Sequence, residues 1–228
     1  MLTVGLDRRD CQAVLKLAET DEHLYAGIGI HPHEADRFRT DDIAFLRDLA
    51  KHPKVKAIGE TGLDLFRNYA LPENQLAAFR AHIALARELN LPLILHIRDA
   101  YPDALKVLQE FGYYHGVMHC YSGDRVFALE AVRLGFYVSF SGSLTYSNAR
   151  LPDAARALPL ERVMVETDAP YLTPVPLRGK FPNEPALVRH TLAALARIRN
   201  LSPAEMARIT TGNGMRLFGI ASHAHTPD

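Results

Sequence analysis

The chain has 228 residues, 48% of them hydrophobic, and a formal net charge of zero. This length and apolar content suit an α/β protein with a substantial core. Without a basic surplus, the chain is not expected to grip nucleic acid by bulk electrostatics, although a nucleic-acid substrate held at one local site stays open. Its two cysteines, Cys11 and Cys120, are too few for a disulfide scaffold.

No stretch approaches the ~18 apolar residues that a membrane span requires. The N-terminus also lacks the basic region, apolar run and small-residue cleavage site of a signal peptide. The sequence therefore predicts a cytoplasmic protein that makes no use of a membrane.

Short apolar runs alternate with helical patterns from end to end. Strands are expected over Leu2–Gly5, Leu24–Ile30, Val55–Ile58, Leu91–Ile97, Gly116–His119, Phe136–Ser139 and Val163–Val165. Helices are expected over Asp10–Ala18, Asp42–Ala50, Glu73–Asn90, Asp103–Phe111, Arg125–Leu134 and Glu184–Phe218, the last broken at "NLSP" with Ser202 as N-cap. This alternation predicts a parallel sheet, either open and doubly wound or closed as a (β/α) barrel.

No linker or low-complexity run divides the chain. One domain is expected over residues 1–220, followed by a polar tail, 221–228, that is expected to be disordered. His223 and His225 in that tail are interpreted as ordinary tail residues rather than as metal ligands.

Several apolar runs finish in a carboxylate or an imidazole. These residues are Glu60 in "GETGLD", His96 in "HIRD", His119 in "GVMHCYSG", Asp168 in "VETDAP" and His31 in "GIHPH". Because the carboxyl ends of parallel strands converge on one rim, these side chains are expected to meet there. Each alone fits a structural role, such as a hydrogen-bonded buried histidine, but their recurrence at equivalent points favours a shared site.

Two imidazoles and two carboxylates suit a divalent ion such as Zn²⁺, Mn²⁺ or Mg²⁺. Glu60, His96 and His119 could supply three ligands and leave a position open for water. Asp168 could then accept a proton from that water or hold it in line. The apolar run Val163–Val165 would serve as a scaffold for Asp168, and Pro170 stops the strand.

Seven motifs, taken in order, resemble the TatD family of metal-dependent deoxyribonucleases, which belongs to the amidohydrolase-like TIM barrels. They are "GIHPHEAD", "AIGETGLD", "LPLILHIRDA", "MHCYSG", "GFYVSFSG", "VETDAPYLTPVPLRGKFPNEP" and "TTGNGMRLFG". The resemblance implies a (β/α)₈ barrel with two divalent ions at the C-terminal rim. Glu60 would bridge the ions, His96 and His119 would complete the shell of one, and Asp168 would bind the other and act on the attacking water.

The resemblance also implies the reaction, which is hydrolysis of DNA phosphodiesters by metal-activated water, of the 3′-5′ exonuclease type on single strands. His31 and Arg98 are the candidate substrate-binding residues, although Arg98 could instead form a local ion pair with Asp99. Arg178 and Lys180 are possible helpers that suit a solvated surface equally well. His33 is expected to be a loop residue.

The family's first motif, an H-x-H on the first strand, has no counterpart here, because the chain begins at the family's second strand. A complete barrel typically needs about 250 residues. We therefore expect a TIM-type barrel that lacks its first β/α unit and has seven strands. One explanation is that the start of translation has been set at an internal Met, and it is favoured because every later motif is intact. The other is a truly shortened gene.

Two consequences are expected from this gap. One ion keeps Glu60, His96 and His119 and is firmly held, whereas the other keeps only Glu60 and Asp168 and is weak or absent, which would lower the rate. The open edges at Leu2–Gly5 and Val163–Val165 would expose apolar faces and favour self-association.

The leading prediction is a divalent-metal-dependent deoxyribonuclease with DNA as its substrate. One alternative is a hydrolase of another ester, either a phosphoester metabolite or an aminoacyl-tRNA. The other is a catalytically impaired barrel that acts through association.

Overall fold

Seven parallel strands form one sheet, in the same order as in the chain. The structure is a computed structural model that describes residues 1–67, 69–147 and 150–221, so that most of the predicted polar tail, with His223 and His225, lies outside the described residues. The strands are β1 (Leu2–Val4), β2 (Tyr25–Ile28), β3 (Val55–Asp64), β4 (Leu93–Arg98), β5 (Gly116–His119), β6 (Tyr137–Phe140) and β7 (Val163–Val165). Each expected strand is present: β5 and β7 have the expected ends, whereas the ends of the other five are shifted, most of all that of β3.

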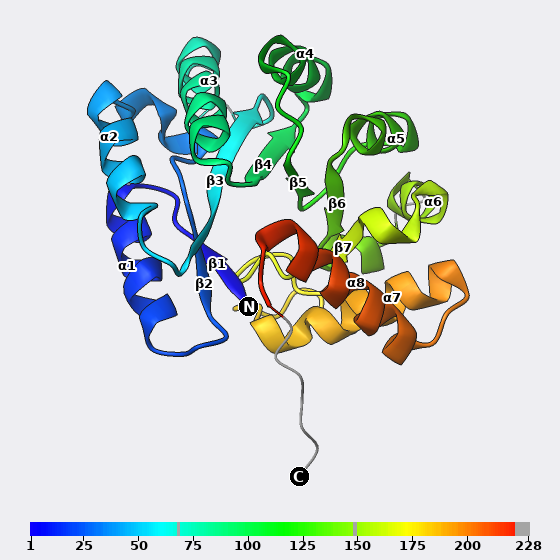
Figure 1. Ribbon diagram of the computed structural model, residues 1–228. Helices are drawn as coiled ribbons and strands as arrows, with labels where there is room; N and C mark the ends of the chain where they lie inside the picture. The colour runs from blue at the N-terminus through cyan, green and yellow to red at the C-terminus, as the bar shows by residue number, and fades with distance from the viewer. Residues whose placement is uncertain (68, 148–149, 222–228) are drawn as a thin grey trace.

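The described residues form eight α-helices, and the first six cover the outer side of the curved sheet (Figure 1). They are α1 (Arg8–Glu19), α2 (Thr40–Leu49), α3 (Pro72–Leu89), α4 (Tyr101–Phe111), α5 (Arg125–Leu134), α6 (Arg150–Ala157), α7 (Val188–Arg199) and α8 (Pro203–Phe218). Short 3₁₀ helices lie at η1 (Pro32–Arg37), η2 (Gly142–Thr145), η3 (Leu160–Arg162) and η4 (Pro185–Leu187). Helix α6 was not predicted, whereas the break between α7 and α8 was, and the Ser202 side chain accepts the Glu205 N–H there.

The sheet curls into part of a barrel and does not close. Among the described residues, β1 pairs only with β2 and β7 only with β6. Figure 1 shows the strands following an arc with α1 to α6 outside it. This arrangement is the predicted TIM-type barrel with seven strands.

The C-terminal end of α8 packs against the inner side of the sheet. Leu217 is buried in a cluster with inward-facing residues of four strands, namely Ala57, Ile94, Val117 and Tyr137. The half-buried residues Leu2, Val4, Met164 and Phe218 pack against the same cluster. The inner faces of both edge strands are therefore partly covered by α8, rather than fully exposed as the open barrel led us to expect.

Strand β3 is longer than predicted because two glycines let it continue close to β4. Gly59 has φ 142° and Gly62 has φ 144°, values that an L side chain rarely adopts. A Cβ atom at Gly62 would collide with the carbonyl oxygen of His96. Glu60 and Asp64 lie on this continuation, four residues apart, and alternation along a strand places both on one face of the sheet.

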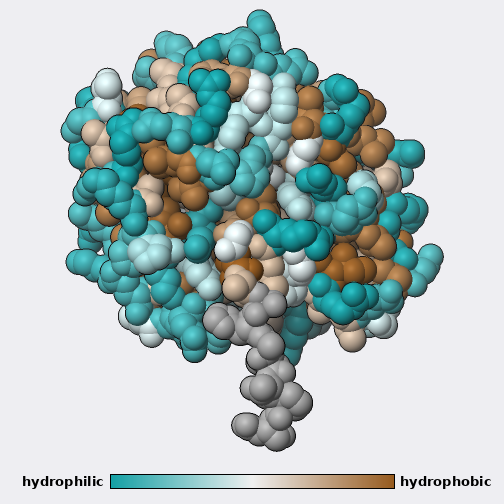
Figure 2. Space-filling view, in the orientation of Figure 1, coloured by the Kyte–Doolittle hydropathy of each residue, from teal (hydrophilic) through white to brown (hydrophobic). Residues whose placement is uncertain are grey.

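One face of the molecule is mostly hydrophilic. Figure 2 shows this face in the orientation of Figure 1, with hydrophilic residues over much of it and hydrophobic residues visible between them. No helix within the described ranges is both long and apolar enough to cross a membrane.

Candidate metal centre

Three imidazoles surround one buried carboxylate oxygen at the carboxyl ends of the strands. Oε1 of Glu60 lies 2.6 Å from Nε2 of His119, 3.2 Å from Nδ1 of His96 and 3.9 Å from Nε2 of His31. The four residues come from β3, β5, β4 and the segment after β2, and Glu60 is only 6% exposed. The structure thus brings together four of the residues that the sequence singled out.

Asp168 lies at the outer side of this group. Its Oδ1 atom is 3.8 Å from Nε2 of His119, and its side chain is 30% exposed. It follows β7 by three residues, where the chain has left the sheet. Among the predicted site residues, Asp168 is therefore the carboxylate that solvent and a substrate could reach.

Two further carboxylates hold the opposite ring nitrogens of the histidines. Oε1 of Glu166 lies 2.9 Å from Nδ1 of His119, and Oδ2 of Asp64 lies 3.1 Å from Nε2 of His96. Metal-ligating histidines almost always donate their second ring N–H to such an acceptor, which fixes the ring and its tautomer. The nitrogens that face Glu60 are thus presented as ligands, and this donor set fits a divalent ion.

Asp64 is fully buried and carries several hydrogen bonds. Oδ1 accepts the backbone N–H groups of Phe66 and Arg67, and Oδ2 lies 2.7 Å from Nε2 of His33. Burial alone would raise the pKa of Asp64, but the hydrogen bonds from His96, the Arg67 N–H and His33 outweigh it and hold the pKa below its usual range. His33, which was expected in a loop, lies in η1 and reaches this carboxylate.

Among the described residues, two groups of three side chains are close enough to hold an ion. They are Glu60, His96 and His119, and His31, His33 and His96. A neutral imidazole has one free lone pair, so His96 can serve only one group at a time. In the second group, Nδ1 of His31 already accepts the backbone N–H of His33, and Nε2 of His33 is hydrogen-bonded to Asp64. Both nitrogens are therefore already engaged. The first group also contains the only carboxylate of the two sets, which favours a cation there.

Charges in the first group stabilise each other. Burial disfavours ionisation of Glu60 and His119, but attraction to His119 holds the pKa of Glu60 well below its usual range. The charges of Glu166 and Glu60 likewise hold the pKa of His119 well above its usual range. Burial raises the pKa of Asp168 to about 6 and lowers that of His31 to about 3.

Arg98 lies on the same face of β4 as His96, two residues further along the strand. Its guanidinium carbon is 3.9 Å from the ring centroid of Phe66. Over the described ranges, Arg98 forms no ion pair with Asp99, so the alternative interpretation of a local ion pair is not supported. Arg178 similarly lies over Tyr146, at 4.1 Å, whereas no side-chain contact within the described ranges places Lys180 at the centre.

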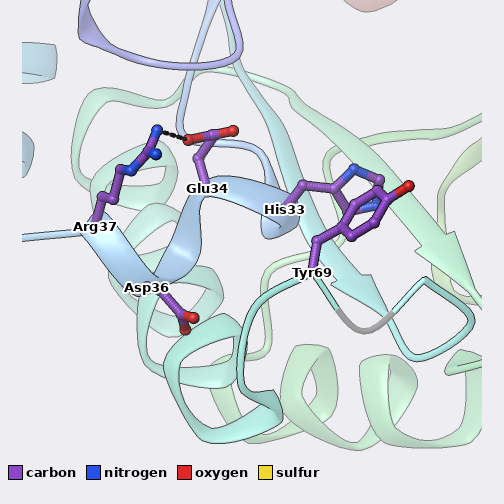
Figure 3. A pocket seen from close by; sticks show the side chains of 5 residues that line it. All are labelled: His33, Glu34, Asp36, Arg37 and Tyr69. Atoms are coloured by element: carbon purple, nitrogen blue, oxygen red, sulfur yellow. Dashed lines mark hydrogen bonds and ion pairs between the residues drawn. The ribbon is translucent and has the colours of Figure 1, made fainter.

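A polar pocket of about 470 Å³ opens beside His33. It is lined by His33, Glu34, Asp36, Arg37 and Tyr69. Figure 3 shows Tyr69 against His33, with ring centroids 4.8 Å apart, and the ion pair of Glu34 with Arg37. Of these residues, His33 connects the pocket to the metal group through Asp64.

Sequence reasoning missed Glu166, Asp64 and the contact of His33. Glu166 stands two residues before Asp168, which was a usable signal because alternate residues of an extended segment share a face. Asp64 was missed because β3 was expected to end at Ile58, before the glycines. His33 meets Asp64 only through tertiary structure, which no local pattern shows.

Comparison with known proteins gives concordant matches. The family described as "TatD related DNase" matches residues 1–219. An uncharacterized metal-dependent hydrolase of Bacillus subtilis, YabD, is 40% identical over 223 residues, covering 96% of this chain and 87% of the relative. The 3′-5′ ssDNA/RNA exonuclease TatD of Enterobacter lignolyticus is 36% identical over 97% of this chain and 88% of its own length. The crystal structure of YjjV, a TatD homologue of Escherichia coli, has a TM-score of 0.91 at 30% identity, covering 96% of this chain and 86% of that one.

Proposed function

The chain belongs to the TatD-related DNase family of metal-dependent hydrolases, and from this premise we propose that it is a nuclease that removes nucleotides from the 3′ end of single-stranded DNA. Relatives named as 3′-5′ ssDNA/RNA exonucleases support this choice of substrate and direction. Binding of the DNA phosphate through a locally held cation also suits a protein with no net charge, because such binding does not require a basic surface.

The observation that carries the proposal is the convergence of His96 and His119 on the buried Glu60 carboxylate. These three residues would hold a divalent ion, with Asp168 at its solvent side. When bound, the ion supplies Lewis-acid chemistry at the phosphate and makes a water a better nucleophile.

The chain's own side chains accept the proton, position the imidazoles and bind the phosphate. Asp168 is ionised above about pH 6, and its partly exposed carboxylate accepts the proton that the attacking water gives up. Glu166 and Asp64 keep the two imidazoles in place through their outer nitrogens. Arg98, on the His96 face of β4, meets a phosphate oxygen of the substrate with a guanidinium that has no carboxylate partner among the described residues.

We further propose one firm ion site and one weak one. The firm site uses Glu60, His96 and His119, whereas the weak one has only Glu60 and Asp168. Two carboxylates alone hold a hard ion loosely and leave its other positions to water or phosphate. Equilibrium dialysis against Mn²⁺ should give one tight site per chain and a second that is at least tenfold weaker.

The test of the function is degradation of 5′-labelled single-stranded DNA in Mg²⁺ or Mn²⁺. The wild type should shorten the strand from its 3′ end, and EDTA should stop it. Glu60→Gln should lose the activity by on the order of 100-fold or more, because the central ligand loses its charge. Glu130→Gln makes the same change on the outer surface of α5, where Glu130 pairs with Arg133, and should leave the rate unchanged.

Parallel assays with other esters test the alternative substrates. A wild type that leaves DNA intact but turns over a phosphomonoester or an aminoacyl-tRNA, with the same dependence on Glu60, would replace the nuclease proposal. Metal-independent association without any turnover would instead favour a binding role.

Self-association through the β1 and β7 edges is a separate proposal. It rests on the unpaired outer sides of both strands among the described residues. The cover that α8 gives to their inner faces should make it weak. Sedimentation velocity over a range of protein concentrations tests it, and a monomer throughout would rule it out.

A further inference from the structure

Exposed aromatic side chains gather around the metal centre. In the part of the chain that the structure describes, four aromatic residues are more than half exposed: Phe66, Tyr69, Tyr171 and Phe181. Phe66 and Tyr69 lie in the loop after β3, which carries Glu60, and Tyr171 and Phe181 lie in the loop after β7, which leads to Asp168. All four therefore belong to loops that follow the carboxyl ends of strands, on the side of the candidate site.

The segment of residues 170–183 after β7 has a fixed backbone. The Asn183 N–H donates to the carbonyl of Pro170 at 2.9 Å, and its side-chain amide donates to the carbonyl of Tyr171 at 2.6 Å. The Thr173 hydroxyl donates to the carbonyl of Lys180 across the loop, at 2.6 Å. Asn183 and Thr173 are buried, so these bonds tie the two limbs of the segment together. Tyr171 and Phe181 are thus held outward by an ordered loop.

The two exposed rings stand next to each other, and the backbone of Tyr171 is hydrogen-bonded to that of Asp168. Their centroids are 6.3 Å apart, with an angle of 43° between the ring planes. The Tyr171 N–H donates to the carbonyl of Asp168 at 2.6 Å. Because Tyr171 and Phe181 are 64% and 72% exposed as residues, the rings can accept a flat partner without first moving another side chain.

Cations without a carboxylate partner accompany the aromatic rings. Arg178, in the same loop, lies over Tyr146, and Arg98 lies over Phe66 across the site. Neither forms an ion pair within the described residues. Flat apolar faces beside unpaired guanidinium groups match the chemistry of a single strand, which offers free base faces and phosphates together. A duplex would offer only its phosphates here, because its base faces are already stacked.

From this arrangement we propose that Tyr171 and Phe181 form a stacking platform for the bases at the end of a single-stranded nucleic acid, with Arg178 contacting its backbone. The inference rests on the proposed nuclease function and specifies how the substrate is held. Stacking on an aromatic ring contributes to binding whatever the base, so the platform predicts little sequence preference.

The experiment measures binding of a 5′-fluorescein oligothymidylate by fluorescence anisotropy, in EDTA so that no cleavage occurs. An oligonucleotide of equal length made of abasic sites has the same phosphates and no bases. The wild type should bind the thymidylate about tenfold or more tightly than the abasic strand. In Tyr171→Ala and Phe181→Ala that ratio should fall several-fold, whereas Tyr171→Phe, which keeps the ring, should preserve it.

Val126→Ala is the matched control. Val126 is an apolar residue of α5 that is 70% exposed, and its truncation should change neither binding constant. Circular dichroism of each variant shows whether it is folded, and because Tyr171→Phe keeps the full packing volume, it distinguishes loss of a ring from loss of structure.

Each remaining outcome bears on a different claim. A wild type that degrades single strands in Mn²⁺ but shows the same base-to-abasic ratio as Tyr171→Ala overturns the platform and leaves the nuclease function standing. A wild type that neither binds nor cleaves single strands overturns both. A dimer that Tyr171→Ala and Phe181→Ala dissociate, with unchanged binding of the oligonucleotide, would make this surface a contact between two copies of the chain.

Discussion

Nδ1 of His119 lies 2.9 Å from Oε1 of Glu166, while Nε2 of the same ring lies 2.6 Å from Oε1 of Glu60. Glu166 is itself fixed, because the same oxygen accepts the backbone N–H of Cys120 at 2.7 Å. The imidazole is therefore held between two carboxylates, with its orientation set before any ion binds.

Glu166→Gln should weaken binding of Mn²⁺ or Zn²⁺ by about 10- to 100-fold, since an outer carboxylate makes the ligand imidazole more basic and fixes its orientation. Titration calorimetry measures the affinity. Glu130→Gln, on the outer surface, should bind the ions like the wild type. Equal affinity in Glu166→Gln and the wild type would mean that Glu166 has no influence on the ligand.

Asp64→Ala should lower the free energy of unfolding by about 3 kcal/mol in EDTA, because it removes a buried carboxylate that accepts the N–H groups of Phe66 and Arg67 and bonds to the rings of His33 and His96. Urea denaturation followed by circular dichroism measures this loss. Asp48→Ala removes an exposed carboxylate that pairs with Lys51 and should cost less than about 1 kcal/mol. Similar losses in both variants would contradict the role given to Asp64.

Ion affinity should fall with decreasing pH. In the ion-free protein the pKa of His119 is raised well above its usual value, chiefly by Glu166 and Glu60 against the effect of burial. An ion must displace this proton, so the apparent affinity should drop by up to about tenfold for each pH unit below that raised pKa. Titrations with Mn²⁺ between pH 6 and 8.5 check the slope. A flat profile over this range would show that His119 is not protonated when the ion enters.

Stability should depend on pH through His82, which is not a member of the metal group. Its Nε2 accepts the Ile30 N–H, and burial lowers its pKa from 6.5 to about 4. The unfolded chain therefore binds a proton at a higher pH than the folded one. The stability from neutral His82 is fully present above pH 6.5 and is lost as the pH falls towards 4, by about 3 kcal/mol.

The matched variant for this effect is His82→Gln, whose amide oxygen can still accept the Ile30 N–H. Its free energy of unfolding, measured by urea denaturation, should fall less steeply than that of the wild type between pH 6.5 and 4. Parallel slopes would assign the pH dependence to other groups, such as His31, whose pKa is also lowered by burial.

The sequence predicted a parallel sheet, because apolar runs separated by helical patterns are typical of one, but the pattern left open whether the sheet is doubly wound or barrel-like. The family resemblance decided for the barrel, whose strands follow the order of the chain. The sequence also predicted that Glu60, His96 and His119 would meet, since the carboxyl ends of parallel strands share a rim. Helix α6 was not predicted. The N-cap at Ser202 was predicted, because a serine before a proline is a local signal for the start of a helix.

The parts that could not be predicted depend on tertiary contacts. Strand β3 continues through Gly59 and Gly62 only because β4 lies close beside it, and this continuation is what brings Asp64 to His96. The contact of His33 with Asp64 likewise joins segments that no local period connects. Packing of Leu217 against the inner side of the sheet depends on where α8 ends relative to β1 and β7.

The central claim is that Glu60, His96 and His119 hold a divalent ion. Anomalous diffraction from crystals soaked in Zn²⁺ tests it most directly, because it places the ion without reference to activity. The account predicts the strongest peak about 2.0–2.2 Å from Oε1 of Glu60, Nδ1 of His96 and Nε2 of His119. A strongest peak at His31 and His33, reached through Nε2 of His96, or no peak near Glu60, would contradict it.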